Sequence, residues 1–208
     1  MTTCNVSTCT IKSAGEHEEH SIVSTLVLAF SSDPAARWVY PESQQYLAHF
    51  PIFVRKFGGK AFSDGIVYVA DECAGAALWL PPDVHPDEQE LVAFLERTVE
   101  YDMHDQVFAV FEQMGNFHPT EPHWYLPLIG VDTHLQGRGY GSALLSHSLA
   151  MCDRDRLPAY LESSNPKNVP LYQRHGFELL GTIQAKGSPQ IFPMLRKPRT
   201  PASGGYMA

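Results

Sequence analysis

The stretch Gln136-Gly137-Arg138-Gly139-Tyr140-Gly141 lies between an apolar segment that ends at Val131 and a helical pattern that begins near Ser142. Its three glycines let the backbone approach a ligand with no Cβ in between. A turn that enters a helix also points free N–H groups and the positive end of the helix dipole at one place. The stretch therefore predicts a site for an anion such as a pyrophosphate.

Two common phosphate-binding motifs are excluded by the spacing of these glycines. A Walker A loop needs a Gly-Lys-Ser or Gly-Lys-Thr step, and none follows here. The dinucleotide fingerprint places its glycines first, third and sixth, whereas these stand at positions 137, 139 and 141. The turn can still bind a pyrophosphate, but as a member of neither of those two families.

The spacing of apolar residues on both sides of the turn predicts an α/β chain. Upstream we expect a helix over 17–30, a helix over 44–57 that Pro51 kinks or splits, strands over 65–70 and 75–80 that form a hairpin, and two helices within 88–114 that break near 101–105. Downstream we expect a strand over 123–131, a helix over 142–154, a strand over 159–162, a short helix over 170–175, and strands from residue 177 and around 190–195. The glycine turn then lies inside a β-α-β unit.

With its flanks, the pattern Gln136-x-x-Gly139-x-Gly141 resembles the acetyl-coenzyme A motif of the GNAT acetyltransferase superfamily, Gln/Arg-x-x-Gly-x-Gly/Ala. Downstream, Leu161-Glu162, Asn165, Leu171-Tyr172 and Gly176-Phe177 resemble the next strand and short helix of that superfamily. Puromycin N-acetyltransferase-like members are similar over roughly 29–198, through Ala29-Phe30, Asp33-Pro34, Trp79 before Pro81-Pro82, Trp124, 158–162 and Asn168-Val-Pro170. The resemblance implies the GNAT fold, a mixed and mostly antiparallel central sheet of about six to seven strands flanked by helices, with two strands that splay at the coenzyme site.

The resemblance also implies which residues bind acetyl-CoA. Backbone groups at the end of the strand over 123–131 would pair with the pantetheine amides, as an added strand pairs with a sheet edge. The N–H groups of the glycine turn would hold the pyrophosphate, with Arg138 adding positive charge. The candidate coenzyme-binding residues are Ile129, Gly130, Val131, Gln136, Gly137, Arg138, Gly139, Tyr140, Gly141, Ser142 and Asn165.

Two residues are candidates for catalysis. In the resembling enzymes the tyrosine at the position of Tyr172 protonates the coenzyme thiolate, and a helix capped by Asn168, begun at Pro170 and stopped by Gly176 would hold its phenol in place. Glu162 ends the strand over 159–162, where some members of the superfamily carry the base that accepts the proton of the amine. The alternatives are a tyrosine that only fills the core and a carboxylate that forms a salt bridge or a cap.

Pro127 is unusual within the strand predicted over 123–131, because proline removes a hydrogen-bond donor from the ladder. A bulge there would let the strands of Leu128 and Leu161 part and admit the pantetheine arm. An edge-strand proline is the alternative.

Length and composition limit the other possibilities. The 208 residues favour a single domain over 1–198 with a flexible tail over 199–208. Fifteen basic against twenty-three acidic residues give a net charge of −8, so we expect neither nucleic acid nor an anionic membrane as a partner. The first residues contain no targeting segment, which favours a cytoplasmic location. The four cysteines lack metal-ligand spacing, so no metal site is expected and the thiols should be ordinary and reduced.

The expected function is therefore acetyl-CoA-dependent N-acetylation of a primary amine on a small molecule, by direct transfer in a ternary complex. A protein or peptide amine is an alternative acceptor, and a silent module that binds acyl-CoA is an alternative function. Helices within 88–114 would close the acceptor side and favour a small molecule, and the negative charge is compatible with a cationic amine. Trp38, Tyr40, Tyr46 and Phe50 are expected to be exposed and to line either the acceptor pocket or a subunit interface; the oligomeric state stays open.

Overall fold

Seven β-strands form one sheet in the order β1-β2-β3-β4-β5-β7-β6 in the computed structural model, which describes residues 9–199. Neighbouring strands are antiparallel except β4 and β5, which are parallel. This arrangement confirms the mixed, mostly antiparallel sheet. The strands are β1 Ile11–Ala14, β2 Ile66–Ala70, β3 Gly75–Leu80, β4 Trp124–Val131, β5 Ala159–Ser163, β6 Glu178–Leu179 and β7 Phe192–Arg196.

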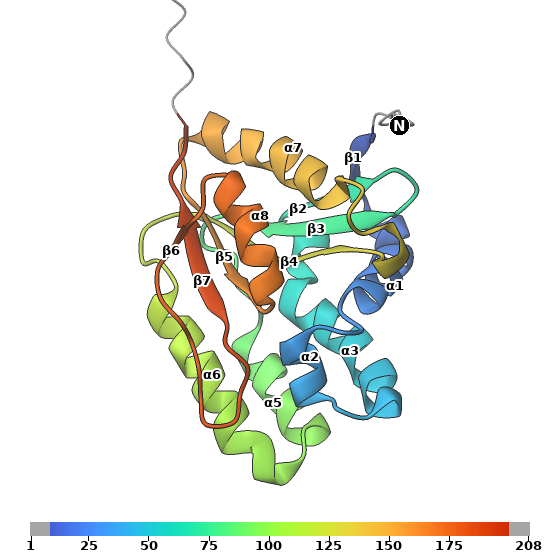
Figure 1. The fold of residues 1–208 in the computed structure, drawn as a ribbon, viewed down its shortest axis with the longest axis vertical. Helices are drawn as coiled ribbons and strands as arrows, with labels where there is room; N and C mark the ends of the chain where they lie inside the picture. The colour runs from blue at the N-terminus through green and yellow to red at the C-terminus, as the bar shows by residue number, and fades with distance from the viewer. Residues whose placement is uncertain (1–8, 200–208) are drawn as a thin grey trace, which may run out of the picture.

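Helices cover both faces of this sheet (Figure 1). One layer contains α7 and α8, whose apolar side chains pack with Trp79, Leu126 and Leu161. The other layer contains α1, α3, α5 and α6, which pack against Leu78, Leu128 and Tyr160. The helices are α1 Glu19–Ala29, α2 Pro34–Val39, α3 Ser43–Gly58, α4 Lys60–Ser63, α5 Glu88–Thr98, α6 His104–Phe117, α7 Tyr140–Asp155 and α8 Val169–Arg174, with short 3-10 turns at η1 Glu16–Glu18, η2 Tyr101–Met103, η3 Thr133–Leu135 and η4 Pro166–Asn168.

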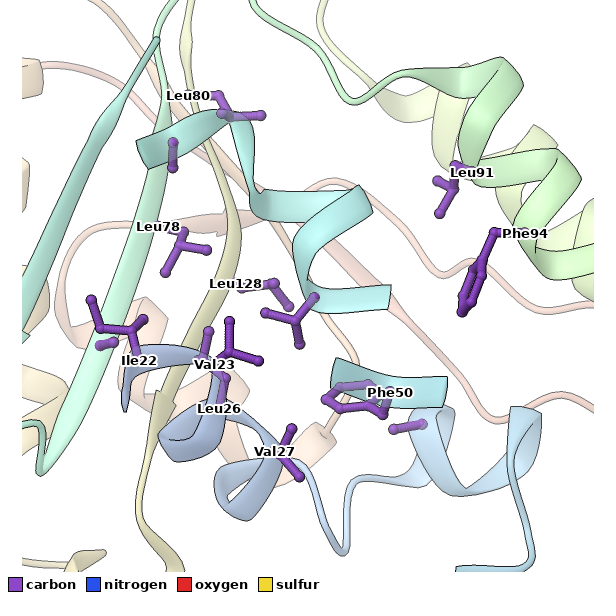
Figure 2. Close-up of a cluster of buried hydrophobic side chains, with 14 of the residues drawn as sticks. Ile22, Val23, Leu26, Val27, Phe50, Leu78, Leu80, Leu91, Phe94 and Leu128 are labelled. Carbon is purple, nitrogen blue, oxygen red and sulfur yellow. The ribbon is translucent and has the colours of Figure 1, made fainter. Parts of the chain in front are cut away.

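The core between α1, α3 and the sheet fixes the position of β4 (Figure 2). Ile22 and Leu26 of α1 are fully buried, and Leu78 and Leu128 face them from the sheet. Full burial of each such side chain contributes about 1.5–3 kcal/mol to the stability of the fold. The strand that carries the candidate coenzyme site is therefore held by the main core.

Most predicted elements are confirmed, and three were missed, among them the short helix α4. The predicted break within 88–114 is present, because η2 separates α5 from α6. Strand β1 and helix α2 had not been predicted from the sequence. Asp33 caps α2, since its carboxylate accepts hydrogen bonds from the N–H groups of Ala35 and Ala36.

Of the two expected effects of Pro51, a split of the second helix is wrong, because α3 runs unbroken from Ser43 to Gly58, and a kink stays a prediction. Phe50 and Val54 are buried on either side of Pro51, so packing of that face compensates for the lost backbone hydrogen bond. Among the helices of residues 9–199, none is long and apolar enough to cross a membrane. Apart from Arg199, the predicted tail over 199–208 lies outside the described residues.

Candidate active site

The parallel strands β4 and β5 pair over only two positions and then separate. Trp124 pairs with Ala159 and Tyr125 with Tyr160, whereas the rest of β4 pairs only with β3 on its other side. The backbone of β4 from Leu126 to Val131 therefore has an edge toward β5 that β5 does not occupy. This confirms the two splayed strands.

A bulge at Pro127 accompanies the separation. Leu78 and Leu80 of β3 pair with Leu128 and Tyr125 of β4, so one residue of β3 between these pairs lies opposite two residues of β4. The extra residue lies in the segment Leu126-Pro127, which explains how a proline is accommodated in a strand at the centre of the sheet. The bulge prediction is confirmed, and β4 is an interior strand of the sheet, although β5 does not pair with it at Pro127.

The glycine turn follows directly after β4 and η3. Gly137 and Gly139 have φ angles of +75° and +91°, which residues with a Cβ rarely adopt. A Cβ built at either glycine would meet nothing within 4 Å, so the turn faces open space. Gly139 precedes the first residue of α7, which has no side-chain cap, and Arg138 is exposed beside it. The free N–H groups and positive dipole of α7 thus meet at a turn with room for an anion.

Side-chain contacts hold the turn to the sheet and to α8. The amide of Gln136 donates a hydrogen bond to the carbonyl of Val131 at 3.1 Å. The hydroxyl of Ser142 lies 2.9 Å from Nε2 of His175, which joins the start of α7 to the end of α8. A hydrogen bond to Asp71 raises the pKa of Tyr140 and ties its phenol to the turn between β2 and β3. Gln136, Tyr140 and Ser142 therefore brace the glycine turn with their side chains.

The two asparagines before α8 differ in how they cap the chain, and coenzyme binding by Asn165 stays a prediction. Asn168 makes no side-chain cap, so the prediction that it caps this helix is wrong. Asn165 instead caps η4, because its side-chain oxygen accepts a hydrogen bond from the N–H group of Lys167 at 3.1 Å. The 3-10 turn between Pro166 and Asn168 lengthens the connection, which moves the capping position three residues upstream.

Tyr172 lies on α8 and is 6% exposed, with its ring at a centroid distance of 6.0 Å from that of Phe177. Burial raises its pKa, and the negative charge of Asp33 raises it further. The phenol is therefore protonated at neutral pH and able to donate a proton.

Glu162 on β5 points to the opposite side of the strand from Leu161, and its side chain is 4% exposed. Its Oε2 accepts a hydrogen bond from the hydroxyl of Tyr125 at 2.9 Å. Its Oε1 has no hydrogen-bond partner, and Nδ1 of His118 lies 3.9 Å from it. Burial and the neighbouring charge of Glu162 raise the pKa of Tyr125 well above its usual value. One carboxylate oxygen is thus held by Tyr125, and the other is buried without a hydrogen-bond partner.

Two histidines lie behind Glu162: His123, which the sequence offers as an outside candidate base at the head of a strand, and His118, which was not identified from the sequence. Nε2 of His118 lies 3.0 Å from Nε2 of His123, whose Nδ1 lies 2.7 Å from the carbonyl of Glu121. Burial lowers the pKa of His123 and favours its neutral form. His118 comes from the end of α6, far along the chain from β5, so no local spacing pattern could have connected it with Glu162.

A cavity of about 1060 Å³, including its open mouth, connects these groups. Its wall includes Ile129 beside the strand opening and both Tyr172 and Glu162, while side chains from α2, α3, α5 and α6 close the other side. Trp38, Tyr40 and Phe50 line this cavity, which agrees with the expectation of an acceptor pocket rather than a subunit interface. The expectation of exposure is wrong, since Tyr40, Tyr46 and Phe50 are at most 3% exposed. Helix α2, which was not foreseen, covers this region.

A family model described as the acetyltransferase (GNAT) family matches residues 37–177, more than half of the chain. The chain belongs to the GNAT acetyltransferase family. The glycine turn, the separated strands and the helix of Tyr172 all lie within the matched residues. The fold and family expected from the motif are confirmed.

Individual relatives agree with this GNAT assignment. The chain is 27% identical over 194 residues to an uncharacterised N-acetyltransferase of Schizosaccharomyces pombe, a match that covers 85% of this chain and 78% of the relative. It is 30% identical, with a TM-score of 0.66, to the crystal structure of histone acetyltransferase HPA2 and related acetyltransferase from Corynebacterium glutamicum, covering 93% of this chain and 98% of that one. A polyamine N-acetyltransferase of Drosophila melanogaster, 16% identical with a TM-score of 0.63 over 91% of this chain and 99% of that one, shares the fold alone.

Proposed function

We propose that this GNAT acetyltransferase moves the acetyl group of acetyl-CoA directly to a primary amine of a small molecule. The observation that carries the proposal is one cavity that begins at the unpaired edge of β4 and contains both Tyr172 and Glu162. When bound, acetyl-CoA supplies the acetyl group as a thioester. The unpaired edge from Leu126 to Val131 suits the pantetheine amides, and the open glycine turn suits the pyrophosphate.

Glu162 and Tyr172 divide the proton transfers of this reaction. The amine nitrogen forms a bond to the acetyl carbon while the carbon–sulfur bond breaks. The free oxygen of Glu162 accepts the proton that the amine loses, and the phenol of Tyr172 gives a proton to the sulfur that leaves. No cysteine among residues 9–199 lines the cavity, which supports direct transfer rather than an acetylated cysteine intermediate.

The closed acceptor side favours a small molecule over a protein. A lysine or an N-terminus on a folded protein needs an open groove across the strand ends, whereas α2, α3, α5 and α6 all contribute to the wall here. A silent module that only binds acyl-CoA is disfavoured because a candidate acid and a candidate base face the same cavity.

Calorimetry with acetyl-CoA and initial-rate kinetics test the proposal together. We expect acetyl-CoA to bind the purified chain, free thiol to appear only when a small primary amine is added, and intersecting double-reciprocal lines as for a ternary complex. Absence of acetyl-CoA binding would refute the proposal. Binding without thiol release for every amine would favour the silent module, and release only with lysine peptides would favour a protein acceptor.

Location and partners stay predictions. The cytoplasmic location was inferred from the first residues, of which 1–8 lie outside the described range. Because the net charge is −8, we propose that neither nucleic acid nor a membrane is a partner of this chain.

A further inference from the structure

A row of aromatic rings lies along the cavity and ends at Glu162. Phe50, Phe53 and Phe57 come from successive turns of α3, and their ring centroids are 5.7 and 5.2 Å apart. The ring of Tyr125 lies 6.3 Å from that of Phe57, and its hydroxyl donates to Glu162. Phe111 meets Phe57 from α6 at 6.4 Å. All three α3 rings and Phe111 line the cavity, so a molecule whose amine reaches Glu162 has its carbon skeleton against aromatic faces and edges.

Charged groups are scarce on the same wall. Among the described residues that line the cavity, Asp33 and Glu162 are the only ones with a charged side chain. Both oxygens of Asp33 already accept hydrogen bonds, one from the N–H groups of Ala35 and Ala36 and the other from the hydroxyl of Ser164 at 2.7 Å. Among the two carboxylates, only Glu162 has an oxygen without a hydrogen-bond partner. Glu162 is therefore the carboxylate that we assign to the acceptor amine.

We infer that the acceptor is a primary monoamine with an apolar, preferably aromatic, carbon skeleton. This inference rests on the proposed function and names its substrate class. A second ammonium group on the skeleton would lie among phenylalanine side chains with no free carboxylate, and an unpaired charge in such surroundings is strongly unfavourable. Diamines and polyamines are therefore poor acceptors, although a polyamine N-acetyltransferase shares this fold.

A matched pair of probes tests the inference on the native chain. Hexylamine and 1,6-diaminohexane differ only by the second amine, and 2-phenylethylamine carries an aromatic ring. We expect kcat/KM to be highest for 2-phenylethylamine and at least about 100-fold higher for hexylamine than for the diamine. Equal or better turnover of the diamine would overturn the monoamine class while leaving the proposed function intact. Acetylation of none of these or other amines would overturn the proposed function, and the inference with it.

A variant that adds a carboxylate to the wall sharpens the test. Met114 of α6 is half-buried and lines the cavity. Met114→Glu should raise the ratio of kcat/KM for the diamine to that for hexylamine by about 10-fold or more, because it supplies a partner for the second ammonium. Met114→Gln has nearly the same size without the charge and should leave the ratio unchanged. An equal ratio in both variants would contradict the inference that missing charge, rather than shape, excludes the diamine.

Discussion

Glu162 has an oxygen without a hydrogen bond on the cavity wall, whereas both oxygens of Asp33 are occupied. Glu162→Gln keeps the size of the side chain and an oxygen for the hydroxyl of Tyr125 but removes the base. We expect kcat/KM to fall about 10²- to 10⁴-fold near pH 7, with a smaller deficit at alkaline pH, where more of the acceptor is free amine. Rates across pH for both proteins provide the measurement, with Glu90→Gln on the exposed side of α5 as control. Deficits that are equal at every pH would argue against Glu162 as the base.

Tyr172 is expected to act through its hydroxyl alone. Tyr172→Phe keeps the ring that packs on Phe177, so acetyl-CoA affinity should stay within a few-fold while kcat falls by about 10²-fold or more. Calorimetry and single-turnover rates separate the two effects. Tyr46→Phe removes another buried hydroxyl, one bonded to the carbonyl of Val27 away from the cavity wall, and should leave kcat unchanged. An unchanged single-turnover rate in Tyr172→Phe would remove this residue from the mechanism.

The sequence identified Glu162 and Tyr172 as candidates because each lies beside a recognisable local motif. Their surroundings were not predictable in the same way. Tyr125 is 37 residues from Glu162 in the chain, and His118 reaches it from the end of another helix. Such contacts depend on how β4, β5 and α6 come together, which no spacing pattern within one segment contains.

At the scale of elements, the glycine turn and α7 act as one unit. Gly139→Val places a β-branched residue at a φ of +91°, a strain of about 1–3 kcal/mol that the turn can relieve only by changing shape. We expect acetyl-CoA affinity to fall by at least about 10-fold, as measured by calorimetry. Gly115→Val is the matched control, because a Cβ there also meets nothing within 4 Å but α6 has no positive φ at that position. Equal affinities in the native chain and Gly139→Val would show that the turn does not bind the coenzyme.

The elements show where local patterns succeed and where packing takes over. The bulge at Pro127 was predictable because proline removes a donor wherever it stands in a sheet. Pro51 does not split α3, because buried neighbours on this helix outweigh one lost hydrogen bond. Asn168 was misjudged because a 3-10 turn intervenes before α8, and that turn is capped by Asn165. Strand β1, four residues long, pairs only with β2 and has too short a pattern to be recognised.

At the scale of the whole molecule, an ion pair joins β7 to α7. Nη1 and Nη2 of Arg196, which is 2% exposed, each donate to one oxygen of Asp153 at 2.8 Å. Asp153→Asn leaves a buried guanidinium without its counter-charge, so the free energy of unfolding should fall by about 3–5 kcal/mol at pH 7. Urea unfolding measures this loss, with the exposed Asp102→Asn as control.

The same pair has a pH dependence of known sign. Hydrogen bonding with Arg196 lowers the pKa of Asp153. A carboxyl group whose pKa is lower in the folded state stabilises the fold above its unfolded pKa of about 3.9, and this contribution disappears as pH falls through the folded pKa. The difference in unfolding free energy between the native chain and Asp153→Asn should therefore shrink as the pH falls below about 3.9. A difference that stays constant from pH 7 to that range would contradict the account.

Direct transfer from acetyl-CoA to an amine is tested most directly by following a labelled acetyl group. The purified chain is incubated with acetyl-CoA that carries a deuterated acetyl group and with 2-phenylethylamine, and the amine, the coenzyme and the intact protein are weighed by mass spectrometry. We expect the labelled acetyl group on the amine nitrogen, one free coenzyme thiol for each product molecule, and no label on the protein. Label on the protein before any appears on the amine, or bound acetyl-CoA with no acetylated product from any primary amine, would contradict this account.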